Sequence, residues 1–461
     1  MKKVSLINAP DSVNFEKDAG SAPPLGSLRV ALAAKDAGAN VRFIDGQHYT
    51  SLDEVLGQIE NDTEVAGITF NRVTLPTVRP LIKGLLDRGV KRIIAGGQAV
   101  IPIGEMLVSD FADSRIMACL GDGEPTINGL VNGDRLPDVP NLVYFDGNDV
   151  MKTKDNLIDY NNLGVLDYSK INGFDWKNYF NISRKVFDNN QNPASAYLAD
   201  GCPNRIKEGC SFCARRKTGV VRSMSPGGAY NQLKHLQDVG ASVVNIESDT
   251  FFSNTSFLRG LEEAMNSRGH LNLGLRVYGG VSELTEANLD LAKRLGVESI
   301  LVGVESGNEE IRRMNGKYFS NQRLFDTLSA CKEKGIKYNP AFVLGMIGET
   351  NETANETVDV ARELLSADGS SNVYASLFMP FPGSPAYNRI NERLAQDPEL
   401  NSKHGNQFSR WDYDWSRLVD AQVEVSTNTS RDYLCECLDS INILNKNARS
   451  VIGNYLKEVS D

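Results

Sequence analysis

The sequence has no apolar run that approaches the ~18–20 residues needed to span a bilayer. It also has no excess of basic charge, because its formal net charge is −10 at pH 7. That balance argues against a protein that binds nucleic acid through a basic face. The N-terminal segment has lysines but lacks the long apolar stretch and the small-residue cleavage site of a signal peptide. From these absences we expect a cytoplasmic protein with no membrane partner.

A disulfide framework is also absent, because the chain has an odd number of cysteines, seven in 461 residues. Three of them fall within twelve positions and form the cysteine loop analysed below: Cys202, Cys210 and Cys213. The other four lie in apolar or helical patterns and are predicted to be small buried residues: Cys119, Cys331, Cys435 and Cys437.

What is present is the composition of a globular protein, 41% hydrophobic and 23% charged, in a chain long enough for two or three domains. The first ~130 residues alternate short apolar runs with amphipathic helices, which predicts a helix-covered parallel sheet of the flavodoxin-like (Rossmann-type) kind. The five expected strands are Val4–Asn8, Val41–Asp45, Val65–Phe70, Arg92–Ala95 and Ile116–Leu120.

Small and polar residues follow four of these strands, at the sheet edge where doubly wound folds bind ligands. Glycine there allows a ligand to approach the backbone closely, although glycines can equally serve only to turn a strand into a helix. The candidate ligand-binding residues at this edge are Asn8, Ala9, Pro10, Thr69, Asn71, Arg72, Val73, Thr74, Gly96, Gly97, Gln98, Gly121, Gly123 and Glu124.

The alternation resumes after residues 135–193, a stretch with little periodicity that is typical of a connector with a short hairpin near Leu142–Lys152. Six strand–helix units in residues 194–390 predict a partial (β/α)6 TIM-like barrel. Their strands are expected at Ala196–Ala199, Val243–Glu247, Leu273–Val277, Ser299–Val304, Tyr338–Leu344 and Val373–Phe378. We therefore predict an α/β protein with four parts: domain 1–134, connector 135–193, barrel 194–390 and a mainly helical C-terminal region 391–461.

The cysteine loop directly follows the first barrel strand, where catalytic loops belong. Three thiolates on one loop can hold an iron–sulfur cluster or a zinc ion. No histidine lies nearby to close a four-coordinate zinc site, since the nearest is His235 in a helical pattern. The spacing thus favours a [4Fe–4S] cluster with one iron left open, with three unrelated thiols as the alternative.

The order of these motifs along the chain resembles that of the radical S-adenosylmethionine (SAM) enzymes, in particular those with an N-terminal cobalamin-binding domain. The resemblance extends to about Tyr387 and depends on the cysteine loop together with these segments: Pro23–Gly26, Gly96–Ala99, Gly121–Glu124, Asp249–Phe251, Val302–Gly307, Gly345–Thr350 and Pro380–Pro385. One departure is that seven residues separate Cys202 from Cys210, where the family usually has three.

The resemblance implies a [4Fe–4S] cluster on the three cysteines, SAM on its open iron and cobalamin on the N-terminal edge. It implies that the SAM-binding residues are Phe212, Ser248, Asp249, Arg276, Glu305, Ser306, Gly345 and Met346. For Arg276 a structural ion pair is an equal alternative. The candidate edge residues named above would contact cobalamin without histidine ligation, and His48 is expected to be a solvent-facing loop residue. No motif identifies a catalytic acid or base.

The implied activity is methylation of an unactivated carbon of a small molecule through methylcobalamin and a 5′-deoxyadenosyl radical. Two alternatives remain open: a radical rearrangement or oxidoreductive cyclisation without methyl transfer, and a non-catalytic corrinoid or iron–sulfur module. An electron donor such as flavodoxin or ferredoxin is implied, and a nucleic-acid partner is not expected. The basic residues Arg205, Lys207, Arg215, Arg216 and Lys217 could steer such a donor or an anionic substrate, or simply be solvated.

Overall fold

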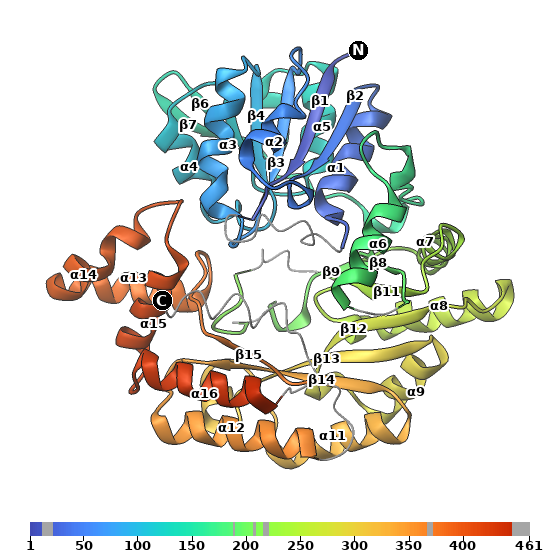
Figure 1. Cartoon of the computed structure of the whole chain (residues 1–461), viewed down its shortest axis with the longest axis vertical. Helices are drawn as coiled ribbons and strands as arrows, with labels where there is room; N and C mark the ends of the chain where they lie inside the picture. The colour runs from blue at the N-terminus through green and yellow to red at the C-terminus, as the bar shows by residue number, and fades with distance from the viewer. Residues whose placement is uncertain (12–21, 188–189, 206–208, 215–220, 367–371, 445–461) are drawn as a thin grey trace. The chain divides into compact units, whose positions relative to one another are not determined.

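The computed structural model of the chain describes residues 1–11, 22–187, 190–205, 209–214, 221–366 and 372–444 (Figure 1). The chain divides into two compact units. Unit 1 is Met1–Ser195 with the short segments Asp238–Ala241 and Arg410–Asp412, and unit 2 is the remainder. The four-part division expected from the sequence stays a prediction. Within the described ranges, no helix has both the length and the apolar character needed to cross a membrane.

Unit 1 is built on a seven-stranded sheet in the order β2-β1-β3-β4-β5-β6-β7. Strands β1 to β5 pair in parallel, which confirms the predicted flavodoxin-like fold, and β6 and β7 add an antiparallel hairpin at one edge. The strands are β1 Lys3–Asn8, β2 Asn40–Asp45, β3 Val65–Thr69, β4 Arg92–Gly96, β5 Ile116–Cys119, β6 Leu142–Asp146 and β7 Asp149–Lys152.

Helices cover both faces of this sheet, as right-handed crossovers in a doubly wound fold require. Helices α1 and α5 pack together on one face, and α2 and α3 pack together on the other (Figure 1). Helix α3 illustrates why these helices pack on the sheet: its buried Leu75, Val78, Ile82 and Leu85 recur at helical spacing and form one apolar side. The helices are α1 Leu25–Asp36, α2 Leu52–Gly57, α3 Leu75–Asp87, α4 Gly104–Phe111, α5 Gly123–Asn132 and α6 Trp176–Phe187.

The predicted connector is partly regular and belongs to unit 1. Its predicted hairpin is β6 and β7, and it also contains α6, a helix that was not predicted. Another part of it lies along the free edge of β2, where the Phe43 N–H donates to the Asn172 carbonyl at 2.8 Å. Gly173 permits this contact, because its φ is +92° and a Cβ there would lie 2.2 Å from the Phe43 carbonyl oxygen.

Unit 2 contains a six-stranded sheet in the order β15-β14-β13-β12-β11-β8, and the unit boundary at Ser195 falls inside β8. Strands β11 to β15 pair in parallel, which confirms the predicted partial barrel. The strands are β8 Pro193–Ala196, β11 Val243–Ile246, β12 Gly274–Gly280, β13 Val297–Glu305, β14 Lys337–Leu344 and β15 Tyr374–Leu377, and a separate ribbon pairs β9 Ala199–Asp200 with β10 Arg222–Ser223.

Alternating burial gives this sheet a covered face and a more open face. In β14, Tyr338, Phe342 and Leu344 are buried, whereas Asn339 and Val343 are half-buried. Figure 1 shows α9, α11 and α12 along one side of the strands, and these helices contact β13 and β14. The barrel helices are α7 Pro226–Asp238, α8 Thr255–Arg268, α9 Glu286–Arg294, α10 Glu309–Met314, α11 Asn321–Glu333 and α12 Asn351–Ser366.

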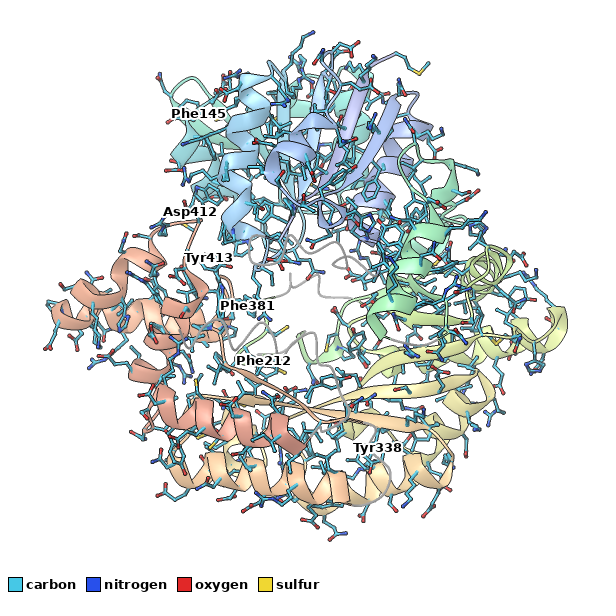
Figure 2. The ribbon with its side chains drawn as sticks, viewed as in Figure 1. Phe145, Phe212, Tyr338, Phe381, Asp412 and Tyr413 are labelled. Carbon is cyan, nitrogen blue, oxygen red and sulfur yellow. The ribbon has the colours of Figure 1, made fainter. Side chains whose placement is uncertain are left out.

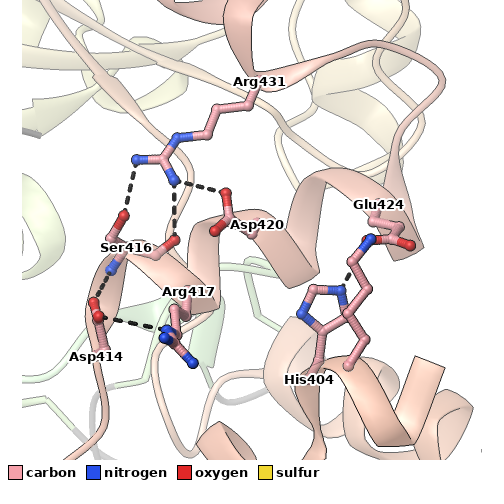
Figure 3. Close-up of polar contacts among 8 residues, drawn as sticks. His404, Asp414, Ser416, Arg417, Asp420, Glu424 and Arg431 are labelled. Carbon is pink, nitrogen blue, oxygen red and sulfur yellow. Dashed lines mark hydrogen bonds and ion pairs between the residues drawn. The ribbon is translucent and has the colours of Figure 1, made fainter. Parts of the chain in front are cut away.

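The C-terminal region is helical, as predicted, and packs on the β15 side of the barrel through α16. Its helices are α13 Pro385–Gln396, α14 Pro398–Phe408, α15 Trp415–Ser426 and α16 Arg431–Leu444. Polar contacts join them (Figure 3): Arg431 donates to Asp420 at 2.6 Å, and His404 contacts Glu424 at 2.8 Å. The end of the predicted helical region, residues 445–461, lies outside the described residues.

Candidate functional site

The cysteine loop leaves the barrel through a tight turn. Gly201, with a φ of +105°, precedes Cys202, and its N–H donates to Asp249 at 3.1 Å. Cys202, Cys210 and Cys213 are all partly exposed. Of the predicted basic residues in this loop, Lys207, Arg215, Arg216 and Lys217 lie outside the described residues.

Ser248 and Asp249, both predicted to bind SAM, follow β11 and hold the start of this loop. The Ser248 hydroxyl accepts a hydrogen bond from the Ala199 N–H at 3.1 Å, and Asp249 accepts one from Gly201. Ser248 is buried. Both side chains therefore support the backbone on either side of β9, immediately before the first cysteine.

The second half of the loop is a turn in which the Cys213 N–H donates to the Cys210 carbonyl at 3.1 Å. Ser211 anchors this turn, because its hydroxyl donates to the side chain of Asn315 at 2.6 Å and its carbonyl accepts from the Ala386 N–H at 2.9 Å. The turn is thus attached to the end of α10 and to the start of α13.

Phe212, inside the turn, packs its ring on a buried apolar cluster (Figure 2). It meets the Phe378 ring edge-on with 6.4 Å between centroids. The cluster consists of Ile311, Met346, Ile347, Phe378 and Ala386, with Val343 also packed against it. Met346, a predicted SAM-binding residue, is fully buried there. The sequence Cys-Ser-Phe-Cys therefore places one polar and one apolar anchor between two thiols.

A buried ion pair lies beside Cys210. The Lys317 ammonium contacts the Glu305 carboxylate at 2.9 Å, and the two side chains are 17% and 10% exposed. Glu305 ends β13 with a φ of +72°, a strained conformation for a residue other than glycine. Gly303 leaves the space for the pair, since a Cβ there would lie 2.6 Å from a Glu305 oxygen.

Burial controls the charge of these groups. It raises the pKa of Cys210 to about 11, and the Lys317 cation acts in the opposite direction. Burial lowers the pKa of Lys317, but the Glu305 carboxylate and the Cys210 thiolate outweigh it, so the net shift is upward. Burial also raises the pKa of Cys202. Cluster binding would deprotonate these thiols, as metals do with coordinating thiols.

The three sulfur atoms lie within electrostatic reach of one another, because Cys202 and Cys213 both raise the pKa of Cys210. Among the described residues, no three His, Cys, Asp or Glu side chains gather as the ligands of a single metal ion do. A [4Fe–4S] cluster does not need such convergence, since each cysteine binds its own iron. The three partly exposed cysteine thiols are the donor type that a [4Fe–4S] cluster takes.

Two other predicted SAM-binding residues have protein partners. Arg276 on β12 pairs with Glu298 at 2.9 Å, and Glu298 is near the amino end of β13, opposite the cysteine loop. This is the structural ion pair that the sequence left open as an alternative. Ser306 is fully buried, and its hydroxyl lies 3.2 Å from that of Thr357.

The Gly345–Thr350 loop after β14 is fixed by its own glutamate and by the C-terminal region. The buried Glu349 carboxylate accepts hydrogen bonds from the N–H groups of Gly345 and Met346. Gln422 of α15 donates to the Gly345 carbonyl at 2.9 Å, and the Asn428 N–H donates to the Glu349 carbonyl at 2.8 Å. Burial raises the pKa of Glu349 to about 7, although the two backbone N–H groups lower it.

In unit 1, the candidate residues after β1 and β3 meet at the point where the strand order reverses. The Ala9 N–H donates to the Thr69 carbonyl at 2.9 Å, and Asn8 donates to Asp45 at 2.8 Å. Asn71 accepts from the backbone of Val73 at 2.8 Å and of Thr74 at 3.2 Å, so its side chain shapes the turn before α3. Pro10 is buried and its carbonyl accepts from Thr77. Asn71 and Arg72 are exposed at this edge.

After β4, Gly96 is half-buried and Gly97 and Gln98 are exposed at the same edge. A Cβ at Gly97 would lie 3.0 Å from the Phe70 carbonyl, and its φ is +103°. Gly121 and Gly123, after β5, are both half-buried. A Cβ at Gly123 would lie 2.7 Å from Val30 on α1, so this glycine allows α5 to pack closely on α1.

Glu124 is part of a buried ion pair. Its carboxylate contacts Arg29 of α1 at 2.7 Å, with side chains 17% and 10% exposed. Arg29 also donates to the Tyr160 hydroxyl at 2.8 Å and lies over that ring. The Glu124 side chain is thus held by the protein itself.

His48 differs from its prediction as a solvent-facing residue. Its side chain is 17% exposed, with Nε2 3.9 Å from Asp45, and its ring centroid lies 4.9 Å from that of Tyr179. The reason is α6, which brings Tyr179 against this turn, where the Tyr179 hydroxyl donates to Asp45 at 2.7 Å.

Three residues that contribute to the site were not found from the sequence: Asn315, Lys317 and Gln422. Asn315 and Lys317 follow α10 in an ordinary helix-ending pattern, Asn-Gly-Lys, which gives no chemical signal. Gln422 lies on one face of an amphipathic helix far along the chain. Only their tertiary contacts identify them.

Comparison with known proteins agrees with this geometry. Residues 197–361 match the family model described as the Radical SAM superfamily. The matched stretch contains the three-cysteine loop, and this match supports the prediction of an enzyme. An uncharacterised methyltransferase, PH0819, of Pyrococcus horikoshii is 22% identical over 409 residues, covering 83% of this chain and 82% of that protein. An uncharacterised protein, MJ1620, of Methanocaldococcus jannaschii is 24% identical over 353 residues, covering 68% of this chain and 67% of that one.

Two solved structures share the fold over most of the chain. The radical SAM methyltransferase TsrM from Kitasatospora setae, with cobalamin and a [4Fe–4S] cluster bound, has a TM-score of 0.70 at 19% identity and covers 86% of this chain and 79% of its own. The cobalamin-dependent SAM radical enzyme OxsB has a TM-score of 0.68 at 15% identity, covering 87% of this chain and 62% of its own. The predicted resemblance is thereby confirmed at the level of fold.

Replacing Glu124 by Ala should destabilise the cofactor-free protein, because Arg29 would stay buried without its carboxylate. Breaking a buried pair typically costs about 3–5 kcal/mol, which should lower the thermal unfolding midpoint by several degrees. The matched control is Glu105→Ala, which breaks the exposed pair with Lys152 at 3.3 Å and should change the midpoint little. Equal midpoints for the two variants would contradict a structural role for Glu124.

Replacing Glu349 by Gln should make the protein more stable at pH 8 but not at pH 5. The pKa of about 7, raised from 4.5, means that the folded state holds this proton more tightly than the unfolded state. Stability is therefore fully present near pH 4.5 and is lost as the pH rises to about 7, by about 3 kcal/mol. Gln carries no such cost. Thermal unfolding at both pH values measures the difference, with the exposed Glu363→Gln as control. A stability difference between Glu349→Gln and the wild type that does not change with pH would contradict this prediction.

Proposed function

We propose that this chain is a cobalamin-dependent radical SAM enzyme, and specifically a methyltransferase that acts on an unactivated carbon of a small molecule. One observation carries the proposal. A three-cysteine loop follows the first strands of a radical SAM domain, in a fold shared over 86% of the chain with a methyltransferase that binds cobalamin and a [4Fe–4S] cluster.

In this proposal Cys202, Cys210 and Cys213 hold the cluster. When bound, the cluster would supply an electron for the reductive cleavage of SAM, and cobalamin would serve as the methyl carrier. The protein's part is to position and shield these cofactors. Ser248 and Asp249 fix the backbone before Cys202, and Ser211 and Phe212 fix the turn between the other two cysteines. The cysteine ligands are thus supported from both ends of the loop.

The Glu305–Lys317 pair places a positive charge, that of Lys317, beside Cys210. The Lys317 cation lies close enough to Cys210 to lower the pKa of its thiol, so it favours the thiolate that ligation requires. Glu305 keeps this cation oriented and buried. We retain Glu305, Met346 and Gly345 as SAM-binding residues together with the rest of the predicted set. Arg276 is assigned instead to the structural ion pair with Glu298 near the amino end of β13.

Cobalamin is proposed to bind at the carboxyl edge of the unit 1 sheet. The exposed residues Asn71, Arg72, Gly97 and Gln98 support this assignment, since they follow β3 and β4 at the carboxyl edge, next to the β1–β3 switch point of the strand order. Glu124 and Gly123 contribute through the fold of this edge, because Glu124 pairs with Arg29 and Gly123 packs against Val30. Gly121 stays in the proposed set. No histidine is assigned to cobalt.

A second candidate function is a radical rearrangement or oxidoreductive cyclisation without methyl transfer. The observation behind it is the fold shared with OxsB, which is described as a cobalamin-dependent SAM radical enzyme and not as a methyltransferase. A product assay separates the two functions: SAM cleavage to 5′-deoxyadenosine with transfer of a labelled methyl group supports the first, and cleavage without methylation supports the second. A small-molecule substrate, an electron donor such as flavodoxin or ferredoxin, and a cytoplasmic location complete the proposal.

Anaerobically reconstituted protein, supplied with hydroxocobalamin and desalted, should retain about four irons and one cobalt per chain. Cys210→Ala and Cys213→Ala should each lose most of the iron, because the cluster has no other ligands to replace them. The control is Cys435→Ala on α16, which should keep wild-type iron. Iron and cobalt analysis with the optical spectrum measures both. Iron without cobalt would overturn the methyltransferase, and iron retained in both loop variants would overturn the cluster site.

A further inference from the structure

One buried amide holds the turn that carries Cys210 and Cys213. Asn315 is fully buried at the end of α10. Its side-chain oxygen accepts the Ser211 hydroxyl at 2.6 Å, and its backbone carbonyl accepts the Ser211 N–H at 3.2 Å. The residue that follows Cys210 is therefore bound twice to Asn315.

The same amide also reaches the loop after β14. Its nitrogen donates to the Ile347 carbonyl at 3.1 Å and to the Ile311 carbonyl at 2.8 Å. Ile347 lies within the Gly345–Glu349 loop. Both amide protons and the amide oxygen are thus used, and an amide is the short neutral side chain that donates and accepts at once.

Gly316, the next residue, sets how closely the turn approaches. Its φ is +84°, and a Cβ there would lie 2.6 Å from the Gly209 carbonyl oxygen and 3.0 Å from the Cys210 Cα. Backbone therefore packs directly on backbone at this point. The turn has little room to move without losing the Asn315 contacts.

We propose that Asn315 is a positioning residue that fixes the Cys210–Cys213 turn relative to the Gly345–Glu349 loop, and so couples cluster retention to the cluster's response to SAM. The inference rests on the proposed function, because it takes the turn as the cluster site and the loop as part of the SAM site. A residue that only stabilised the fold would lower overall stability and leave the cluster's spectrum unchanged.

The test uses the reconstituted full-length protein with Asn315→Ala and Ser211→Ala. Two quantities are measured: the rate of iron loss to a ferrous chelator under anaerobic conditions, and the change that SAM causes in the electron paramagnetic resonance spectrum of the reduced cluster. Asn315→Ala should lose iron about tenfold faster and show a diminished SAM-induced change. Ser211→Ala should lose iron faster but keep the SAM-induced change, because the amide still holds Ile347.

The matched control is Asn339→Ala, which removes another Asn–Ser hydrogen bond of the same barrel, 2.8 Å long, to Ser299 near the amino ends of β13 and β14. It should match the wild type in both measurements. The double variant Asn315→Ala/Ser211→Ala should lose iron no faster than Asn315→Ala, because both changes remove the same bond.

Wild-type iron loss and a wild-type spectral change in Asn315→Ala would overturn the inference. If that variant fails to fold, Ser211→Ala decides, since it removes only a hydroxyl group, and unchanged iron loss there overturns the inference as well. Failure of the wild-type protein to hold iron on its three cysteines would instead overturn the proposed function, so the two failures are distinguishable.

Discussion

Parallel strand pairing brings the loops that follow successive strands to one edge of a sheet, and the functional residues of this protein depend on that constraint. In unit 2 it gathers Asp249 after β11, Glu305 at the end of β13 and Gly345 after β14 at the edge where the cysteine loop begins. Asp249 and Gly345, almost a hundred positions apart in the sequence, thereby lie at the same edge of one sheet. The strand order therefore brings these residues together, and the local hydrogen bonds and glycine contacts then set their exact positions.

Within that neighbourhood, close approach is obtained by omitting side chains. Gly316 lets backbone meet backbone beneath Cys210, and Gly303 leaves space for the Glu305–Lys317 pair. The buried Lys317 ammonium is paired with the Glu305 carboxylate, because burying an isolated ammonium would cost free energy. The left-handed conformation of Glu305 is the kind of backbone strain that a well-packed surrounding can sustain.

The sequence was sufficient for the strands and the loop but not for the contacts that hold the loop. Strand β14 was expected at Tyr338–Leu344 and is Lys337–Leu344, and its buried residues alternate with more exposed ones as a strand requires. Helix α6 was missed, since its flanks are rich in Asn and Asp. Asn315 and Lys317 could not be predicted, because their contacts are with residues distant in the sequence. Arg276 and Glu124 illustrate the opposite error, since both were predicted to bind a ligand and both form ion pairs within the protein.

The strip of chain around Asn172 that lies along β2 has a consequence for the behaviour of the protein at high concentration. An uncovered edge strand offers a template for pairing with another molecule. Here the Phe43 N–H is already bonded to Asn172, and the opposite edge is β7, a short strand with Asp149 and Lys152 at its ends. Both edges of the unit 1 sheet thus carry features that disfavour strand pairing with another molecule.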